Sequence, residues 1–331
     1  MITIEPNKLE GLLSEPFDLK GKTIWVAGAT GMVGSATIRR LKFEDCKILA
    51  PCRNELDLLS QNAVNEWTST NQPDVVIVAA AKVGGIFANS NRPAEFIYNN
   101  LLIESNIIHA AYLNNIKKLL FLGSACIYPR EASQPMPEEA LLTGKLEPTN
   151  ESYAIAKIAG IKMCEAYRNQ YGCDFISAQP NNLYGPGDNF DIKTGHVIPA
   201  LLHRTHLAKV KRDSSLTIWG TGTVKREFLH VDDCADAFIH LIKFYSGISH
   251  INVGTGEELT IKELAQKISN IVGFTGKLKF DRTMPDGSPR KLLDNSKMKA
   301  LNWKSTVSLD DGLNSSYQWF LENFSEIRTS S

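Results

Sequence analysis

The feature that most constrains this fold is a short apolar run followed by three glycines at a spacing of three residues. Thr23–Ala27 predicts a buried strand, because it is short and rich in β-branched and apolar side chains. Gly28, Gly31 and Gly34 come next, and Met32–Leu41 has the pattern of a helix. A strand, a glycine turn and a helix in this order begin a parallel unit whose next strand returns beside the first.

Strands and helices keep alternating up to about residue 180. Further strands are predicted for the short apolar runs at 47–50, 74–80, 119–122 and 174–179. Long helices are predicted over about 93–114 and through Tyr153. Strands that are apolar throughout are typical of a parallel sheet with helices on both faces. The sequence therefore predicts an α/β fold with a Rossmann-type, doubly wound parallel sheet.

The pattern changes after residue 183. A helix through Leu201 and Leu202 and a strand at 216–219 predict an insertion, and the chain is expected to return to the sheet near Ile251–Val253. Later helices are predicted at 260–271 and at about 309–324. We therefore predict a Rossmann-type domain at 20–183, with a return segment at about 228–255, and a smaller C-terminal α/β substrate-binding lobe at 184–227 and 256–331.

The composition excludes several classes of protein. The chain has 331 residues, 36 acidic and 36 basic side chains and a pI of about 7.0. Nucleic-acid binding and anionic-membrane binding usually need a basic surface, so neither is expected. No apolar run reaches the roughly 20 residues of a membrane span, and the N-terminus carries no secretory signal. The six cysteines form no CxxC pair, so we expect reduced thiols, no metal site and a cytoplasmic protein.

The glycine turn has the spacing that dinucleotide-binding units use. The first glycine allows a sharp turn, the second lets backbone N–H groups approach a pyrophosphate, and the third lets the helix pack on the sheet. The N-terminus of the helix adds positive potential for the phosphates. Ordinary tight turns also contain glycine, so the spacing alone does not establish a dinucleotide-binding site. Its place between a strand and a helix favours the dinucleotide.

The end of the second strand indicates which dinucleotide is bound. Units that bind NAD usually carry an Asp or Glu there, which holds the ribose 2′-hydroxyl. Here the strand is followed by Arg53, and the first carboxylate is Glu55. A cation favours the 2′-phosphate of NADP, through charge-assisted hydrogen bonds of roughly 1.5–3 kcal/mol. The alternative is that Arg53 is an ordinary surface charge.

A hydroxyl, a phenol and an ammonium form a second candidate set. Ser124 follows a predicted strand, and Tyr153 and Lys157 lie four residues apart on one face of the next helix. Ligands of open α/β sheets bind at the carboxyl ends of the strands, where Ser124 would lie. The Lys157 ammonium would lower the pKa of the phenol, and Tyr153 could protonate a carbonyl oxygen as hydride arrives. A Tyr-x-x-x-Lys pair also arises by chance, so only its position after this strand gives it weight.

Cys126 and His196 are candidates with two open interpretations each. Cys126 is two residues past Ser124, so alternation along a strand would put both side chains on one face. Most strand cysteines, however, are small buried hydrophobic residues. His196 lies in a region with several glycines and fits a solvent-facing loop equally well. The residues alone assign neither of them a role.

Nine stretches of the sequence carry a resemblance to a known family. They lie at 79–86, 122–129, 147–151, 153–160, 182–186, 196–201, 226–233, 250–256 and 289–294. Their order along the chain is more specific than the glycines or the Tyr/Lys pair. The chain resembles the extended short-chain dehydrogenase/reductases and, within them, the GDP-L-fucose synthases, which act on GDP-4-keto-6-deoxy-D-mannose.

The resemblance implies a bifunctional enzyme that makes GDP-L-fucose. Ser124, Tyr153 and Lys157 match the reductase triad of the family. Cys126 and His196 match its base and acid for epimerisation at carbons 3 and 5. Both carbons flank the 4-keto group, so their protons are acidic and an enolate intermediate needs hydrogen-bond support. NADPH then reduces carbon 4.

The resemblance also implies a homodimer and two sets of binding residues. The positions expected to bind NADP(H) are Gly28, Gly31, Met32, Val33, Gly34, Arg53, Asp57, Ala80, Ala81, Tyr153, Lys157, Pro180, Asn181, Leu183 and His196. The positions expected to bind the nucleotide-sugar substrate are Asn182, Arg204, Trp219, Arg226 and Lys291. Arginine suits a diphosphate, and an indole can pack on a ring.

The sequence departs from the family inside the glycine turn. A His-Arg pair is frequent there, and Ala29 and Thr30 take its place, so the preference for NADP depends more on Arg53. Two other functions stay open: another nucleotide-sugar epimerase, reductase or dehydratase, and a non-catalytic NADP-binding regulatory module. A dehydratase would favour a carboxylate pair beside the serine, where Ala125 and Cys126 stand. A regulatory module need not keep all five catalytic candidates.

Replacing Arg53 with glutamate tests the assignment of the cofactor. We expect Arg53→Glu to weaken NADPH binding by roughly ten- to a hundredfold, because a charge-assisted hydrogen bond to the 2′-phosphate is lost. NADH lacks that phosphate and serves as the internal control. Fluorescence titration with each cofactor measures the two affinities, and an unchanged ratio between them would contradict the assignment.

Overall fold

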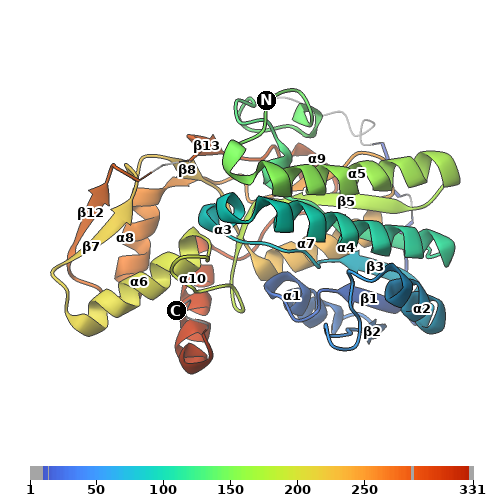
Figure 1. Ribbon diagram of the computed structural model, residues 1–331, viewed down its shortest axis with the longest axis horizontal. Coiled ribbons are helices and arrows are strands. Elements are labelled where there is room, and N and C mark those ends of the chain that lie inside the picture. The colour runs from blue at the N-terminus through green and yellow to red at the C-terminus, as the bar shows by residue number, and fades with distance from the viewer. Residues whose placement is uncertain (1–9, 14, 285–286, 328–331) are drawn as a thin grey trace.

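The computed structural model describes residues 10–13, 15–284 and 287–327 (Figure 1). The N-terminal residues on which the absence of a secretory signal was judged lie largely outside these ranges. At the centre is a six-stranded sheet with the order β10-β5-β4-β3-β1-β2, in which every pairing is parallel. Its strands are β1 (Thr23–Ala27), β2 (Lys47–Leu49), β3 (Val75–Val78), β4 (Lys118–Leu122), β5 (Phe175–Pro180) and β10 (Ile251–Val253).

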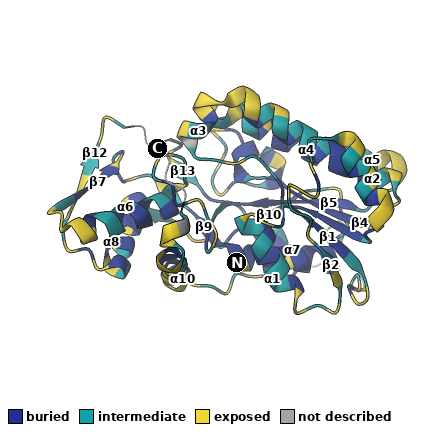
Figure 2. Cartoon of the chain, turned by 60° about the horizontal axis from the view of Figure 1, so that its bottom comes forward, coloured by how far each residue is buried: buried dark blue, intermediate teal, exposed yellow. Residues whose placement is uncertain are grey.

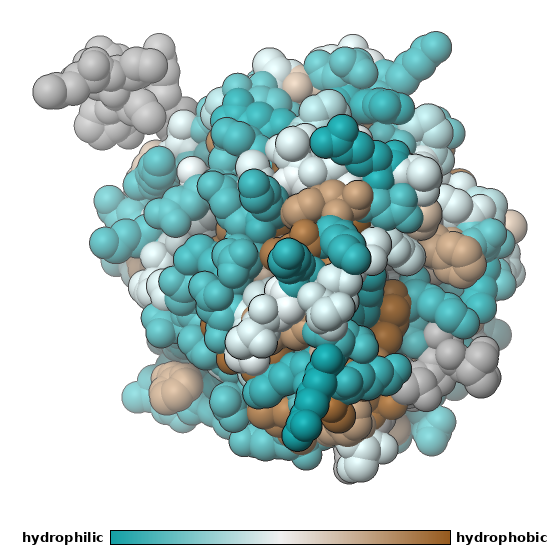
Figure 3. Space-filling model, turned by 90° about the vertical axis from the view of Figure 1, so that its left-hand side faces the viewer, coloured by the Kyte–Doolittle hydropathy of each residue, from teal (hydrophilic) through white to brown (hydrophobic). Residues whose placement is uncertain are grey.

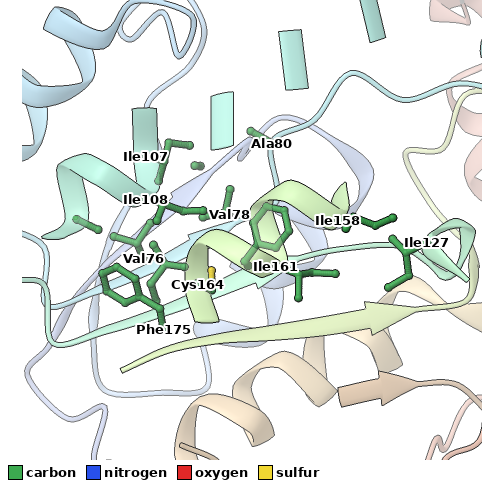
Figure 4. Packing of buried hydrophobic residues seen from close by; sticks show 14 of the residues in the cluster. Val76, Val78, Ala80, Ile107, Ile108, Ile127, Ile158, Ile161, Cys164 and Phe175 are labelled. Carbon is green, nitrogen blue, oxygen red and sulfur yellow. The ribbon is translucent and has the colours of Figure 1, made fainter. Parts of the chain in front are cut away.

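Helices cover both faces of this sheet. One face carries α2 (Gln61–Asn71), α4 (Pro93–Leu113) and α5 (Glu151–Tyr171), and the other carries α1 (Met32–Leu41) and α7 (Val231–Phe244). Side chains alternate between the two layers, so Phe121 of β4 packs in the first and Leu120 in the second. Figure 4 shows the first layer, where strand residues such as Val76 and Phe175 meet Ile107 and Ile161 of the helices. The predicted doubly wound parallel sheet is confirmed.

The predicted elements differ from the observed ones mainly by one or two residues at their ends. The strand predicted at 74–80 stops at Val78, and the two alanines that follow turn toward the glycine loop after β1. The helix predicted at 260–271 is α8 (Ile261–Val272), because Thr260 is its N-cap. The Thr260 hydroxyl accepts from the Glu263 N–H, and the Glu263 carboxylate accepts from the Thr260 N–H. With this capping box at its N-terminus, the helix starts one residue later than predicted.

A smaller group of elements lies at one end of the sheet (Figure 1). Its apolar centre joins side chains of α6 (Val197–Lys211), α8, α10 (Leu309–Glu322), β7 (Ser215–Trp219) and β12 (Lys277–Asp281). The other strands and α-helices of the chain are α3 (Ile86–Asn91), β6 (Asn182–Tyr184), β8 (Lys225–Arg226), β9 (Phe228–His230), β11 (Leu259–Thr260), β13 (Arg290–Lys291) and α9 (Ser296–Ala300). In Figure 2, α6 and α8 each show both buried and exposed residues, and Figure 3 shows hydrophobic side chains among hydrophilic ones on the outer face of this group. The predicted smaller C-terminal α/β part is therefore present.

The segment before β1 packs along the C-terminal end of α7. The Leu13 and Phe17 N–H groups donate to the carbonyl oxygens of Phe244 and Lys243, at 3.0 and 2.8 Å. Leu19 is buried in the layer beneath α7. Within the described ranges, no helix has the length and apolar character that crossing a membrane requires, and no cluster of three or more His, Cys, Asp or Glu could bind a metal ion.

Candidate active site

The glycine turn after β1 has the geometry of a pyrophosphate-binding loop. Gly28 has a φ of +87°, and a Cβ on it would lie 2.6 Å from the backbone nitrogen of Ala80. A Cβ on Gly34 would meet the carbonyl oxygen of Gly28. Gly31 caps α1 without a side-chain hydrogen bond, so the first N–H groups of the helix have no capping side chain. These residues fit a pyrophosphate bound by backbone N–H groups at the N-terminus of α1.

The end of β4 brings Ser124 and Cys126 together, but not through strand alternation. Ala125–Ile127 forms the short 3₁₀ helix η1, and Ser124 is its N-cap. The Cys126 N–H donates to Ser124 Oγ at 3.4 Å. The prediction that both side chains lie on one face of a strand is wrong, because the chain leaves the sheet after Leu122 and turns into η1. The hydroxyl and the thiol still become neighbours.

Tyr153 lies in the first turn of α5, and its ring packs edge-on against Phe96 of α4, with the centroids 6.4 Å apart. Burial raises the pKa of the phenol, Cys126 and Glu104 raise it further, and a hydrogen bond with Ser124 acts in the opposite direction. The prediction of a lowered pKa is wrong, because burial outweighs the other influences. Tyr153 therefore keeps its proton at neutral pH, which is the state that a proton donor needs.

Lys157 is enclosed between α5, α4 and the sheet. Its Nζ lies 4.6 Å from the centroid of the Phe121 ring and 3.7 Å from Oε2 of Glu104. Burial lowers the pKa of the ammonium, and Glu104 and Cys126 raise it. The protonation of Lys157 thus depends on its few charged neighbours, since little solvent reaches the ammonium.

The Cys126 thiol is surrounded by groups of the predicted site. Burial raises its pKa, and the Ser124 hydroxyl and the ammonium groups of Lys291 and Lys157 lower it. Lys291 belongs to β13 and approaches from the smaller part of the chain. The structure therefore gathers buried Cys126 and Lys157 and partly buried Ser124 and Tyr153 into one group at the carboxyl end of β4, with Lys291 close to it.

His196 is the N-cap residue of α6 and lies beside a carboxylate. Its Nδ1 is 4.0 Å from Oδ1 of Asp188, which is itself almost fully buried. The imidazole is about half exposed; its partial burial lowers the pKa, but the Asp188 carboxylate outweighs this effect and raises that pKa. In the described part of the chain, no hydrogen bond or ion pair joins His196 to Ser124 or Cys126. The structure therefore assembles the other four catalytic candidates more closely than this one.

Most of the predicted cofactor residues follow the carboxyl ends of parallel strands, where ligands of doubly wound sheets bind. They are Ala80 and Ala81 after β3, Arg53 and Asp57 in the turns after β2, Pro180 at the end of β5, Asn181 and Leu183 just beyond it, and Met32 and Val33 at the start of α1. Arg53 is exposed to solvent. Its exposure fits both a phosphate contact and an ordinary surface charge.

The predicted substrate residues fall into two pairs and a single amide. Arg204 lies over the Trp219 indole, with Cζ 5.5 Å from the ring centroid. Arg226 and Lys291 are direct partners in the parallel pairing of β8 with β13. Asn182 begins β6, and its Nδ2 donates to the carbonyl oxygen of Glu227 at 2.8 Å. Arg226 and Lys291 therefore lie side by side, with Lys291 close to Cys126. Arg204 is stacked on an aromatic ring.

Three carboxylates that the sequence analysis did not single out help to organise the site. Glu104 faces Lys157, and Asp188 faces His196. Glu227 is fully buried and accepts the N–H groups of Gly256 and Leu293 at 2.7 and 3.0 Å, and the amide of Asn181. For Glu104 the sequence did offer a sign of burial. It lies next to Ile103 in a predicted helix whose apolar residues recur at helical spacing.

Replacing Asp188 with asparagine tests the origin of the His196 charge. We expect Asp188→Asn to lower the pKa of His196, because the carboxylate that favours the charged imidazole is removed. A histidine NMR titration measures this pKa. The control is Asp232→Asn, which removes a carboxylate beside His230 and should leave the His196 titration in place. An unmoved His196 signal in Asp188→Asn would show that the carboxylate has no such role.

Comparison with known proteins agrees with this geometry. The model of the NAD dependent epimerase/dehydratase family matches residues 24–254. A GDP-L-fucose synthase of Sinorhizobium fredii is 54% identical over 308 residues, which cover 93% of this chain and 98% of that protein.

Solved structures extend the comparison. The GDP-L-fucose synthetase of Naegleria fowleri bound to NADP has a TM-score of 0.89 at 28% identity, covering 96% of this chain and 99% of that one. A GDP-6-OMe-4-keto-L-xylo-heptose reductase of Campylobacter jejuni has a TM-score of 0.86 at 38% identity, covering 93% and 99%. The chain therefore belongs to the NAD dependent epimerase/dehydratase family and, within it, to the GDP-L-fucose synthases.

Proposed function

We propose that this protein epimerises GDP-4-keto-6-deoxy-D-mannose at carbons 3 and 5 and reduces carbon 4 with NADPH, which yields GDP-L-fucose. The observation that carries the proposal is the group of Ser124, Cys126, Tyr153 and Lys157 at the end of β4, in a fold whose glycine turn fits a pyrophosphate. Family membership supports it, since the Sinorhizobium fredii relative bears the name of this activity. The first step is epimerisation and the second is reduction.

In the epimerisation, Cys126 acts as the base and His196 as the acid. The ketone at carbon 4 acidifies the protons on both neighbouring carbons. Lys157 and Lys291 favour the Cys126 thiolate against the effect of burial, so the thiol can accept a proton from the sugar. His196 has a raised pKa beside Asp188 and can return a proton to the opposite face. Ser124 and Tyr153 donate hydrogen bonds to the enolate oxygen between the two steps.

In the reduction, bound NADPH supplies the hydride. Tyr153 donates its proton to the oxygen on carbon 4, and its raised pKa ensures that the proton is present. Ser124 donates a second hydrogen bond to the same oxygen. The Lys157 ammonium then stabilises the phenolate that Tyr153 has become. These residues therefore serve both half-reactions at one carbonyl oxygen.

The smaller part of the chain offers a site for the GDP group. Arg226 and Lys291 are paired across β8 and β13 and suit a diphosphate. Trp219, which is about half exposed and stacked on Arg204, offers a surface for a ring. Asn182, at the start of β6, offers an amide.

We propose the same division into domains as the sequence analysis. Residues 20–183 with the return segment at about 228–255 bind NADP, and 184–227 with 256–331 bind the nucleotide sugar. The return segment contains α7, which packs on the large sheet, and β10, which is the edge strand beside β5. This arrangement supports a cofactor domain built from two parts of the chain.

We also propose a cytoplasmic homodimer. Helices α4 and α5 lie side by side (Figure 1) and expose large apolar or aromatic side chains. These side chains are Tyr98, Leu113, Ile155 and Tyr171. Exposed apolar groups gathered on one face are typical of protein interfaces.

A second candidate function is the reduction of a different GDP-4-keto sugar. The Campylobacter jejuni neighbour, a reductase of a heptose derivative, has nearly the same fold at 38% identity. A non-catalytic NADP-binding module is a third candidate. Absorbance of NADPH in the presence of GDP-4-keto-6-deoxy-D-mannose separates the three. Turnover supports the proposal, turnover only with another GDP-4-keto sugar supports the second, and none with any supports the third.

Removing the Tyr153 hydroxyl tests the reduction. We expect Tyr153→Phe to slow NADPH oxidation by roughly 10²–10⁴-fold, the usual contribution of a positioned acid. Stopped-flow absorbance measures the hydride-transfer step. Tyr112→Phe on α4 is the control, since that ring packs on Tyr167 and Tyr171, and it should react at the rate of the unmodified enzyme. A rate for Tyr153→Phe within a factor of three of this control would rule out the acid role.

Removing the Cys126 thiol tests the epimerisation. We expect Cys126→Ser to lose most of the exchange of solvent deuterium into carbons 3 and 5, because a hydroxyl is a far weaker base than a thiolate. Mass spectrometry of the sugar measures the exchange. Cys173→Ser, which alters a cysteine beyond the C-terminal end of α5, should exchange normally. Full deuterium uptake by Cys126→Ser would contradict the base role.

A further inference from the structure

A buried carboxylate that the proposed mechanism leaves unused lies behind the catalytic lysine. Glu104 projects from α4 into the apolar layer between the helices and the sheet, the layer that Figure 4 shows around Ile107, Ile108 and Phe175. It is 1% exposed, and neither of its carboxyl oxygens has a hydrogen-bond partner in the described structure. A carboxylate in such a place is costly unless a charge compensates it.

The compensating charge is the ammonium of Lys157. Its Nζ is 3.7 Å from Oε2 of Glu104, which is within ion-pair range and longer than a hydrogen bond. The two side chains are 3% and 2% exposed. On its other side, Nζ lies over the Phe121 ring. Lys157 is therefore held between a carboxylate from α4 and an aromatic face from β4.

A glycine in the middle of α5 makes room for this arrangement. A Cβ on Gly160, three residues after Lys157, would lie 2.8 Å from Oε2 of Glu104 and 2.7 Å from Cε1 of Phe121. Glycine inside a helix is less favourable than alanine, so it needs a reason there. The reason visible in the structure is that the carboxylate and the ring occupy the space of its side chain.

The charges around this pair act in known directions. Burial lowers the pKa of Lys157, and Glu104 from α4 and Cys126 from η1 raise it. Burial raises the pKa of Glu104 and Lys157 lowers it, which leaves the pKa raised to about 7. Glu104 also raises the pKa values of Tyr153 and of Cys164, both on α5. Glu104 is thus anionic mainly above neutral pH, where a buried lysine would otherwise lose its proton.

We propose that Glu104 is a positioning residue that acts through Lys157: its carboxylate fixes the lysine side chain against Phe121 and keeps the ammonium charged inside the closed site. The inference rests on the proposed function, in which charged Lys157 stabilises the Tyr153 phenolate and favours the Cys126 thiolate. Without the carboxylate, the ammonium would become neutral lysine at a lower pH. Both half-reactions would then lose the positive charge of Lys157 at alkaline pH and keep it at acid pH.

The test is the pH dependence of kcat for NADPH oxidation by Glu104→Gln, which keeps the shape of the side chain. We expect rates close to those of the unmodified enzyme near pH 6 and an alkaline decline that begins at lower pH, with about a tenfold or greater loss at the alkaline end. Glu104→Asp keeps the carboxylate charge, so its alkaline decline in kcat should lie closer to that of the unmodified enzyme. Glu165→Gln is the control, because it removes a carboxylate that pairs with Lys162 at the surface of α5, the helix that carries Lys157.

A second measurement does not depend on turnover. NMR of protein labelled with ¹³C at lysine Cε, with NADP bound, follows the charge of Lys157 directly, and Lys157→Arg identifies its signal. We expect this signal to titrate at lower pH in Glu104→Gln than in the unmodified protein or in Glu165→Gln. An unmoved titration, or an equal loss of kcat at every pH, would overturn the inference. Absence of turnover in the unmodified enzyme would instead contradict the proposed function and leave the NMR test intact.

Discussion

The close packing of α5 on β4 is the constraint on which the rest of the active site depends. Gly160 leaves room for the Phe121 ring from the sheet and for the Glu104 carboxylate from α4. With the helix at this distance, its first turns lie over the end of β4, where the chain turns into η1. Tyr153 and Lys157 are thereby brought to Ser124 and Cys126 without any of the four belonging to a flexible loop tip.

The smaller part of the chain is tied to the sheet at the same edge by a second buried acid. Glu227, between β8 and β9, accepts backbone N–H groups from the segments after β10 and β13 and the amide of Asn181 after β5. A Cβ on Gly254 would lie 2.8 Å from its carboxyl carbon, so the chain passes close to the carboxylate there as well. Residues expected to meet the cofactor and residues expected to meet the nucleotide sugar are therefore held in one hydrogen-bonded unit.

The local sequence pattern predicted the structure correctly where one interaction decides the conformation. The strand–glycine–helix unit, the parallel strands and the return at Ile251–Val253 all follow from hydrophobic runs and turn residues, and the structure has them. The pattern misled where tertiary surroundings decide. Spacing alone could not reveal that Ser124 and Cys126 meet through η1. A neighbouring lysine suggested a lowered pKa for Tyr153, whereas burial raises it.

The sequence by itself determined the class of fold, the place of the glycine turn and the identity of the reactive groups, because these depend on residue type and on spacing along the chain. The tertiary structure decided which groups meet and what charge they carry. Glu104 and Lys157 are 53 positions apart in the sequence, yet their side chains share one enclosed space. Whether a buried ammonium keeps its proton depends on that enclosure and on the carboxylate within it. Neither can be predicted from the local sequence pattern.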